Sequence, residues 1–141
     1  MSDFKWGILQ ATVYGLIQMM IGWYAPPVQT FIYFMAVILL DYVIAFGVLG
    51  LSGTISRKLG GNAVSFAVGA FTALFLRFLC HFASGILIWG SFAPEGQPVW
   101  LYSLTYNAGY MIPNAIVCGV CIVLLCTVVS PETLRPMKKR A

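Results

Sequence analysis

The stretch from Ala63 to Trp89, AVSFAVGAFTALFLRFLCHFASGILIW, decides the fold because it is long, apolar and almost free of charge. Its only residues of the Asp, Glu, Lys, Arg and His set are Arg77 and His81. A helix that crosses the hydrocarbon of a bilayer needs roughly 20 mostly apolar residues. The stretch therefore predicts a membrane-spanning helix that carries two polar groups inside the bilayer.

The rest of the chain has the same character. Of its 141 residues, 60% are hydrophobic and 9% are charged, whereas soluble domains average about 45–50% apolar and about 25% charged residues. A surface facing water could not be built from this composition. Three more apolar stretches lie at about 7–23, 30–51 and 105–129. We predict an all-α fold, a polytopic membrane helical bundle with about four transmembrane helices in a single domain over residues 1–141.

The segments between these spans carry turn and breaker residues. Glycines stand at both ends of the segment 52–62, and the segment 90–100 holds two prolines and two glycines, so both are predicted to be loops. Pro113 lies inside the last span, where proline kinks or breaks a helix.

The basic residues predict the orientation of the chain. Lys5 precedes the first span, Arg57 and Lys58 lie between the second and third, and four Lys and Arg residues lie in the tail 130–141. The two other connections have no basic residue. Because short cytoplasmic loops are enriched in Lys and Arg, we expect the N-terminus and the basic C-terminal tail to be cytoplasmic.

The spans contain three ionisable residues: Asp41, Arg77 and His81. Because burying such groups in a bilayer costs free energy, each of them requires a structural or functional explanation. At roughly 1.5 Å per residue, Asp41 and Arg77 both fall near the middle of the membrane, and His81 lies one turn further out. One interpretation is that Asp41 and Arg77 only pair to stabilise packing. The other is that these residues, with Asn107 and nearby aromatic rings, line one outward-facing cavity.

The residue types in such a cavity indicate what it would bind. A buried carboxylate favours a cation, and aromatic faces favour flat rings and cations. The edges of His and Asn side chains suit a heterocycle that carries donors and acceptors. The sequence alone therefore predicts a small, flat, positively charged heterocyclic ligand.

No enzymatic, metal-binding or cofactor-binding motif is recognisable, so we expect no catalytic residue, no metal site and no cofactor. The pair Cys118 and Cys121 forms a C-x-x-C in the middle of a span, with no second pair and no nearby His, which favours helix packing. A phosphate-binding glycine loop is missing, so ATP hydrolysis would have to come from partners. The hypothesis of an intramembrane enzyme that uses His81 and Asp41 is weakened, because no Ser or Cys lies in a recognisable catalytic setting.

A family resemblance then extends these inferences. The stretch LRFLCHFASGILIWGSFAPEGQPVWLYSLTYNAGYMIP, Leu76 to Pro113, resembles the thiamine-specific S components of energy-coupling factor (ECF) transporters, the ThiT/YuaJ thiamine transporter family. LLDYVIAFGVLGLSG, Leu39 to Gly53, is similar to the fourth helix of that family, and KWGILQATVYGLIQMMIG, Lys5 to Gly22, to its third. The matches follow the family order, with H-F-x-x-G, F-A-P-x-G and Y-S-L-x-x-N as the more specific motifs.

The resemblance implies that the chain captures thiamine from outside the bacterial cell membrane for ATP-driven uptake. Its partners would be a membrane coupling protein and two ATPase subunits. Asp41 would face the thiazolium, Trp89 would stack on the pyrimidine, and Tyr102 and Asn107 would contact its polar edge. The implied ligand-binding residues are Tyr24, Asp41, Tyr42, His81, Trp89, Tyr102 and Asn107, with Arg77 as a structural residue or a partner of Asp41.

One departure from the family pattern leaves alternatives open. Family members have six helices, and this chain matches them from the third onward, so we expect that the first two, with a pocket tryptophan and a coupling motif, are lacking. The remaining alternatives are an S component for another vitamin or a thiamine precursor, and a ligand-free membrane scaffold subunit.

Overall fold

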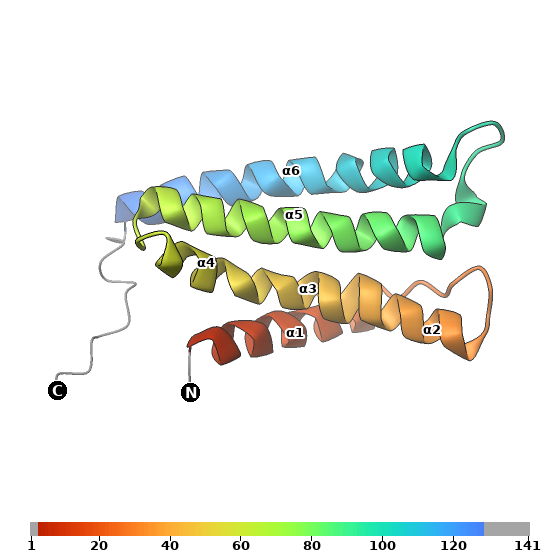
Figure 1. Ribbon diagram of the computed structural model, residues 1–141, viewed down its shortest axis with the longest axis horizontal. Helices are drawn as coiled ribbons and strands as arrows, with labels where there is room; N and C mark the ends of the chain where they lie inside the picture. Colours follow the sequence, from red (N-terminus) through yellow and green to blue (C-terminus); the bar gives the residue numbers. More distant parts are fainter. Residues whose placement is uncertain (1–2, 129–141) are drawn as a thin grey trace.

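The computed structural model describes residues 3–128, which form four helical rods lying side by side along the long axis (Figure 1). The first is α1 (Asp3–Ile21), the second runs from Phe31 to Lys58, and the last two are α5 (Ala63–Leu87) and α6 (Val99–Val128). No strand occurs within residues 3–128. The predicted all-α helical bundle is confirmed.

Three of the four rods, Phe31–Lys58, Ala63–Leu87 and Val99–Val128, are long and apolar enough to cross a membrane. Helix α1 is not among them, although a first span was predicted at 7–23, because Lys5, Gln10 and Gln18 lower its hydropathy. Large apolar side chains such as Phe31 are exposed on the outside of the bundle. The chain is therefore a membrane protein with large apolar side chains on the outside of its helical bundle.

The second rod changes its helical type several times. It consists of α2 (Phe31–Val37), a π-helical turn η1 (Ile38–Ile44), α3 (Ala45–Gly47), a 3₁₀ turn η2 (Val48–Leu51) and α4 (Ser52–Lys58). π-Helical turns inside α-helices are rare and occur frequently at functional sites. Here the π-helical turn carries Asp41 and Tyr42.

The loop predicted at 52–62 is shorter than expected, because the helix continues to Lys58. Packing explains the difference. Gly69 of α5 lies directly against the backbone of Ser52 and Ser56, so this part of the rod is held as a helix by its neighbour. The reversal is confined to 59–62, where Gly60 and Gly61 adopt positive φ angles of 105° and 65°. Such angles favour glycine.

Helix α5 then begins at a capped end. The side-chain oxygen of Asn62 accepts a hydrogen bond from the backbone N–H of Ser65 at 2.9 Å. This satisfies one of the free donors of the first helical turn. The turn and its cap fix where α5 starts, and so the height at which its polar residues lie.

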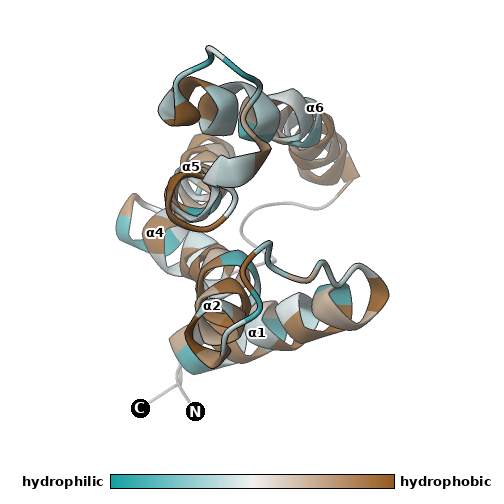
Figure 2. Cartoon of the chain, turned by 90° about the vertical axis from the view of Figure 1, so that its right-hand side faces the viewer, coloured by the Kyte–Doolittle hydropathy of each residue, from teal (hydrophilic) through white to brown (hydrophobic). Residues whose placement is uncertain are grey.

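Helix α1 packs on the second rod through glycines. A Cβ atom built on Gly7 would lie 2.6 Å from the carbonyl oxygen of Gly50, and one on Gly15 would lie 2.6 Å from that of Tyr42. No side chain fits at either crossing, so the backbones approach closely. In the end-on view of Figure 2, α1 and α2 lie together on one side of the bundle and α5 and α6 on the other.

Helix α6 differs from expectation at its start and at its proline. It begins at Val99 rather than 105, because the carbonyl oxygen of Pro98 accepts the first N–H groups, from Leu101 and Tyr102. The helix continues past Pro113 without a break up to Val128. The whole length of α6 is thus available to place side chains on one face.

The two ends of the bundle follow the predicted alternation. The start of α1, the turn between α4 and α5, and the end of α6 lie at one end, and the α1–α2 and α5–α6 connections lie at the other (Figure 1). Lys5, Arg57 and Lys58 belong to the first end. The predicted basic tail 130–141 lies outside the described residues.

Candidate functional site

A cavity of about 430 Å³ is lined by residues of α1, the second rod, α5 and α6, close to the end that carries the α1–α2 and α5–α6 connections. The seven ligand-binding residues predicted from the sequence all line it: Tyr24, Asp41, Tyr42, His81, Trp89, Tyr102 and Asn107. The structure thus brings together side chains that lie far apart in the chain. Their contact with a ligand stays a prediction.

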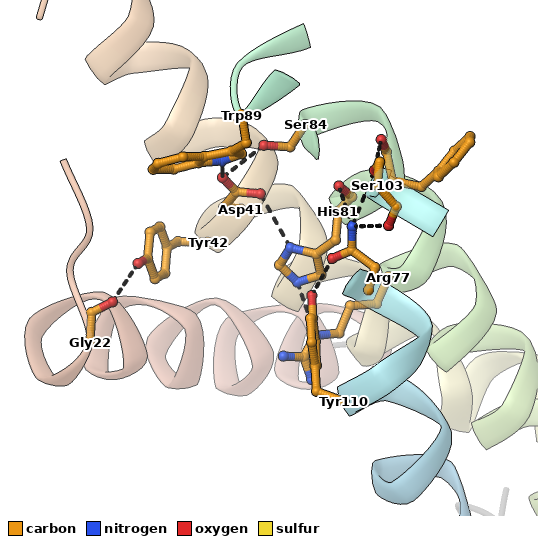
Figure 3. A network of polar contacts seen from close by, with 11 residues as sticks. Gly22, Asp41, Tyr42, Arg77, His81, Ser84, Trp89, Ser103 and Tyr110 are labelled. Carbon is orange, nitrogen blue, oxygen red and sulfur yellow. Dashed lines mark hydrogen bonds and ion pairs between the residues drawn. The ribbon is translucent and has the colours of Figure 1, made fainter. Parts of the chain in front are cut away.

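Asp41 is the centre of the polar contacts in this cavity (Figure 3). Its carboxylate accepts hydrogen bonds from the Ser84 hydroxyl at 2.8 Å and from the Trp89 indole N–H at 3.0 Å. The Nδ1 atom of His81 lies 3.2 Å from its other oxygen. The carboxylate is therefore held in one orientation by three groups of the α5 end, while its own backbone belongs to the π-helical turn.

Arg77 does not take the role of direct partner to Asp41 that the sequence suggested. Its Nε atom donates to Nε2 of His81 at 3.4 Å, and its guanidinium lies over the Phe46 ring, 4.2 Å from the centroid. An arginine can only donate, so Nε2 of His81 accepts and Nδ1 carries the hydrogen. The result is a directed chain of contacts from Arg77 through His81 to Asp41.

Asn107 forms a second polar centre on the facing helix. Its amide nitrogen donates to the carbonyl oxygens of Ser103 at 2.8 Å and His81 at 3.2 Å. Its amide oxygen accepts the hydroxyl of Tyr110 at 2.6 Å. The hydroxyl of Ser103 donates in turn to the carbonyl oxygen of Phe82 at 2.8 Å, which ties α6 to α5.

Aromatic side chains form the wall near the connections. The Tyr42 hydroxyl donates to the carbonyl oxygen of Gly22 at 2.8 Å. The Tyr42 ring stacks on Trp23 with centroids 6.0 Å apart, and Trp23 stacks on Phe34 at 6.1 Å. These contacts attach the α1–α2 connection, which includes Tyr24, to the second rod.

Several lining residues were not selected from the sequence. They include Gln18, Phe46, Gly85, Phe92, Tyr106 and Tyr110. Helical spacing could have found some of them, because residues three, four and seven apart share one face of a helix. Tyr106, Asn107 and Tyr110 follow Ser103 at those intervals on α6, and the periodicity was hidden because almost all of α6 is apolar.

The chemistry of the cavity is that of a binding site for a cationic ring. It combines one carboxylate, held by three neighbours, with indole and phenol rings, the amides of Gln18 and Asn107, and the guanidinium of Arg77, which lies over Phe46 and contacts His81. Cation attraction to aromatic faces adds to attraction by the carboxylate. Among residues 3–128 no group of three or more His, Cys, Asp or Glu side chains is placed to hold a metal ion.

Comparisons with known proteins agree with this chemistry. The family model described as "Thiamine transporter protein (Thia_YuaJ)" matches residues 1–133. The chain is 38% identical to Thiamine transporter ThiT of Bacillus subtilis (strain 168), with 87% of this chain and 68% of the relative covered. It is 31% identical to Thiamine transporter ThiT of Lacticaseibacillus paracasei, with 90% and 62% covered.

The chain thus spans about two thirds of the length of the curated relatives that it matches. No solved structure gives a significant match. The resemblance identified from the motifs between Leu76 and Pro113 is confirmed by the family model, which covers nearly the whole chain. The chain belongs to the thiamine transporter protein family, Thia_YuaJ.

Proposed function

We propose that this chain is a thiamine-binding membrane subunit that captures thiamine from outside the cell for ATP-driven uptake. The observation that carries the proposal is the carboxylate of Asp41, held by Ser84, Trp89 and His81 at the wall of an aromatic cavity. Thiamine joins a permanently cationic thiazolium ring to a flat aminopyrimidine. The carboxylate among aromatic rings suits the thiazolium ring, and the amide of Asn107 suits the aminopyrimidine.

Electrostatics support the placement of the cation. Two unit charges 4 Å apart attract by about 4 kcal/mol at an effective dielectric constant of about 20. Arg77 also lines the cavity, but its guanidinium lies over Phe46 and contacts His81, so it forms no direct ion pair with the carboxylate. Asp41 lines the cavity, so its negative charge acts on a cation placed there, and its contacts with Ser84, Trp89 and His81 set its orientation before the ligand arrives.

The size of the cavity also supports the proposal. Pockets for small molecules occupy about 300–1,000 Å³ and combine apolar walls with a few polar groups. The cavity of about 430 Å³ lies within this range and has mostly aromatic walls. Its polar groups belong to all four helical rods, so a ligand would be held between both halves of the bundle.

Energy for uptake would come from partners. We propose that the chain is not an enzyme, that it needs no cofactor, and that a membrane coupling protein and two ATPase subunits of an ECF transporter drive transport. We further propose that it lies in the bacterial cell membrane with both termini and the α4–α5 turn in the cytoplasm. The positions of Lys5, Arg57 and Lys58 at one end of the bundle support this orientation.

The first prediction concerns tryptophan fluorescence. Thiamine added to the purified chain in detergent should quench its emission in a saturable way, because Trp89 lines the cavity. Trp89→Phe should remove most of the quenching. Trp6→Phe is the control, since Trp6 lies on α1 outside the cavity and its substitution should leave the response intact.

The outcome separates the remaining classes of function. A ligand-free scaffold would show no saturable response to thiamine and would refute the proposal. Competition by thiamine phosphates and by the free pyrimidine tests for a related vitamin or precursor. If one of these binds more tightly than thiamine, the ligand has been assigned wrongly while the site has been assigned correctly.

A further inference from the structure

The hydrogen bonds around Asn107 use both N–H groups of its amide and one of the two lone pairs of its amide oxygen. The two N–H groups of the amide are shared between the carbonyl oxygens of His81 and Ser103 and the hydroxyl oxygen of Ser103. The amide oxygen has two lone pairs, and the Tyr110 hydroxyl takes one of them at 2.6 Å. A ligand in the cavity can therefore only donate a hydrogen bond to Asn107, whose amide oxygen accepts it.

The amide cannot be turned round at low cost. Exchanging its oxygen and nitrogen would place the oxygen against two backbone carbonyl oxygens, those of His81 and Ser103. Neither carbonyl can donate a hydrogen bond, so a buried acceptor would lose its partners. Asn107 is 4% exposed, so water cannot compensate. The carbonyl groups set the direction of the amide plane, and Tyr110 sets the position of its oxygen.

Tyr110 is itself held in place on two sides. Its ring meets the His81 ring edge to face with centroids 6.0 Å apart and an interplanar angle of 78°. It meets the Tyr106 ring at 6.0 Å and 74°. Figure 3 shows Tyr110 of α6 next to His81 and Arg77 of α5. The phenol is thus packed between rings and presents its hydroxyl to Asn107 in one orientation.

We propose that Tyr110 is a positioning residue that fixes the place of the Asn107 amide oxygen, which the two carbonyl groups already turn toward the cavity side as an acceptor, and thereby makes the cavity select a ring with an amino group over one with an oxo group. An oxo group opposite the amide oxygen would set two acceptors against each other. Without the phenol, the amide oxygen loses its restraint and can move away from such a group. The inference rests on the proposed function, because it assumes that a ring of the thiamine type enters the cavity.

The test compares two ligands in matched variants. Dissociation constants are measured for thiamine and for its analogue with an oxo group in place of the ring amino group, using the full chain in detergent. The wild-type chain should prefer thiamine, and Tyr110→Phe should reduce that preference by about 5–10-fold, as expected for one hydrogen bond. Tyr33→Phe is the control, because it removes a phenol hydroxyl from α2 outside the cavity.

A double-mutant cycle distinguishes positioning from a general structural effect. In an Asn107→Leu background, the further change Tyr110→Phe should leave the preference unchanged, because the group that Tyr110 holds is gone. Equal weakening of both ligands by Tyr110→Phe would overturn the inference. Equal dissociation constants of the wild-type chain for the oxo analogue and for thiamine would overturn it too. A wild-type chain that binds neither ligand would instead refute the proposed function.

Discussion

Asp41→Asn should weaken thiamine binding by about 100-fold while the chain still folds. The substitution keeps the shape of the side chain but removes the negative charge beside the cavity. Loss of one partner from a buried charged pair costs about 2–5 kcal/mol, and tenfold in affinity corresponds to about 1.4 kcal/mol. The amide also cannot accept from Ser84, Trp89 and His81 together as the carboxylate does.

The charge effect can be separated from the loss of shape by the choice of ligand. Titration calorimetry with thiamine and with its free aminopyrimidine, which lacks the thiazolium ring, should show a large loss for the first and a small loss for the second. Asp41→Glu keeps the charge and should retain more affinity than Asp41→Asn. Glu95→Gln is the matched control, because it removes an acid from the α5–α6 connection outside the cavity.

Two results would count against this role of Asp41. If Asp41→Asn binds thiamine within about threefold of the wild-type chain, the carboxylate does not face the cation. If the free pyrimidine loses as much affinity as thiamine, the substitution has deformed the cavity rather than removed a charge contact. A similar loss in Glu95→Gln would indicate a long-range effect of net charge, which salt would screen.

Much of the fold follows from the sequence because lipid imposes simple rules. In a bilayer the backbone must satisfy its own hydrogen bonds, so long apolar stretches become helices. The stretch from Ala63 to Trp89 therefore predicted α5 to within two residues of its end. Depth along the helices also placed Asp41 near His81, since both positions follow from counting residues in antiparallel spans.

The parts that could not be predicted depend on packing between helices. The glycines of 52–62 suggested a loop, but contact with Gly69 keeps the second rod helical to Lys58. No sequence signal marks the π-helical turn at Ile38–Ile44, which carries Asp41. Arg77 was considered a partner for Asp41 because opposite charges at equal depth attract, yet its side chain lies over Phe46 and contacts His81.

Dependence on helix packing also explains why some residues of the cavity wall were not predicted. Asn107 was identified through a motif, whereas Tyr110 was not, because helical spacing places it on the same face as Asn107 but does not show that the two side chains meet. Its role depends on a hydroxyl within 2.6 Å of the amide of Asn107, which only the packed helices define. Gly85 was not selected because the chain has 14 glycines, and the sequence does not show which of them lie at a contact that leaves no room for a side chain.

Gly85→Ala should destabilise the chain and abolish most thiamine binding, although alanine is the better helix former. Gly85 is buried where α5 meets α6, and a Cβ atom there would fall on the hydroxyl oxygen of Ser103. It would also lie 2.8 Å from the Cβ of Ser103 and 3.3 Å from the amide nitrogen of Asn107. Forcing extra atoms into a packed contact costs about 1–3 kcal/mol, and here it also displaces the groups that orient Asn107.

Gly109→Ala is the matched control, because Gly109 lies on α6 with open space around its missing Cβ. The control should be neutral or more stable by up to about 1 kcal/mol, as helix propensity predicts, so the two substitutions should shift the thermal unfolding temperature in detergent in opposite directions.

Adding Ser103→Gly to Gly85→Ala removes the obstructing side chain and should recover part of the stability. It should not recover thiamine affinity, because Asn107 would still lack the hydroxyl of Ser103 as a partner. If Gly85→Ala instead unfolds at the temperature of the control, α5 and α6 can separate without loss, and the cavity wall does not depend on this contact.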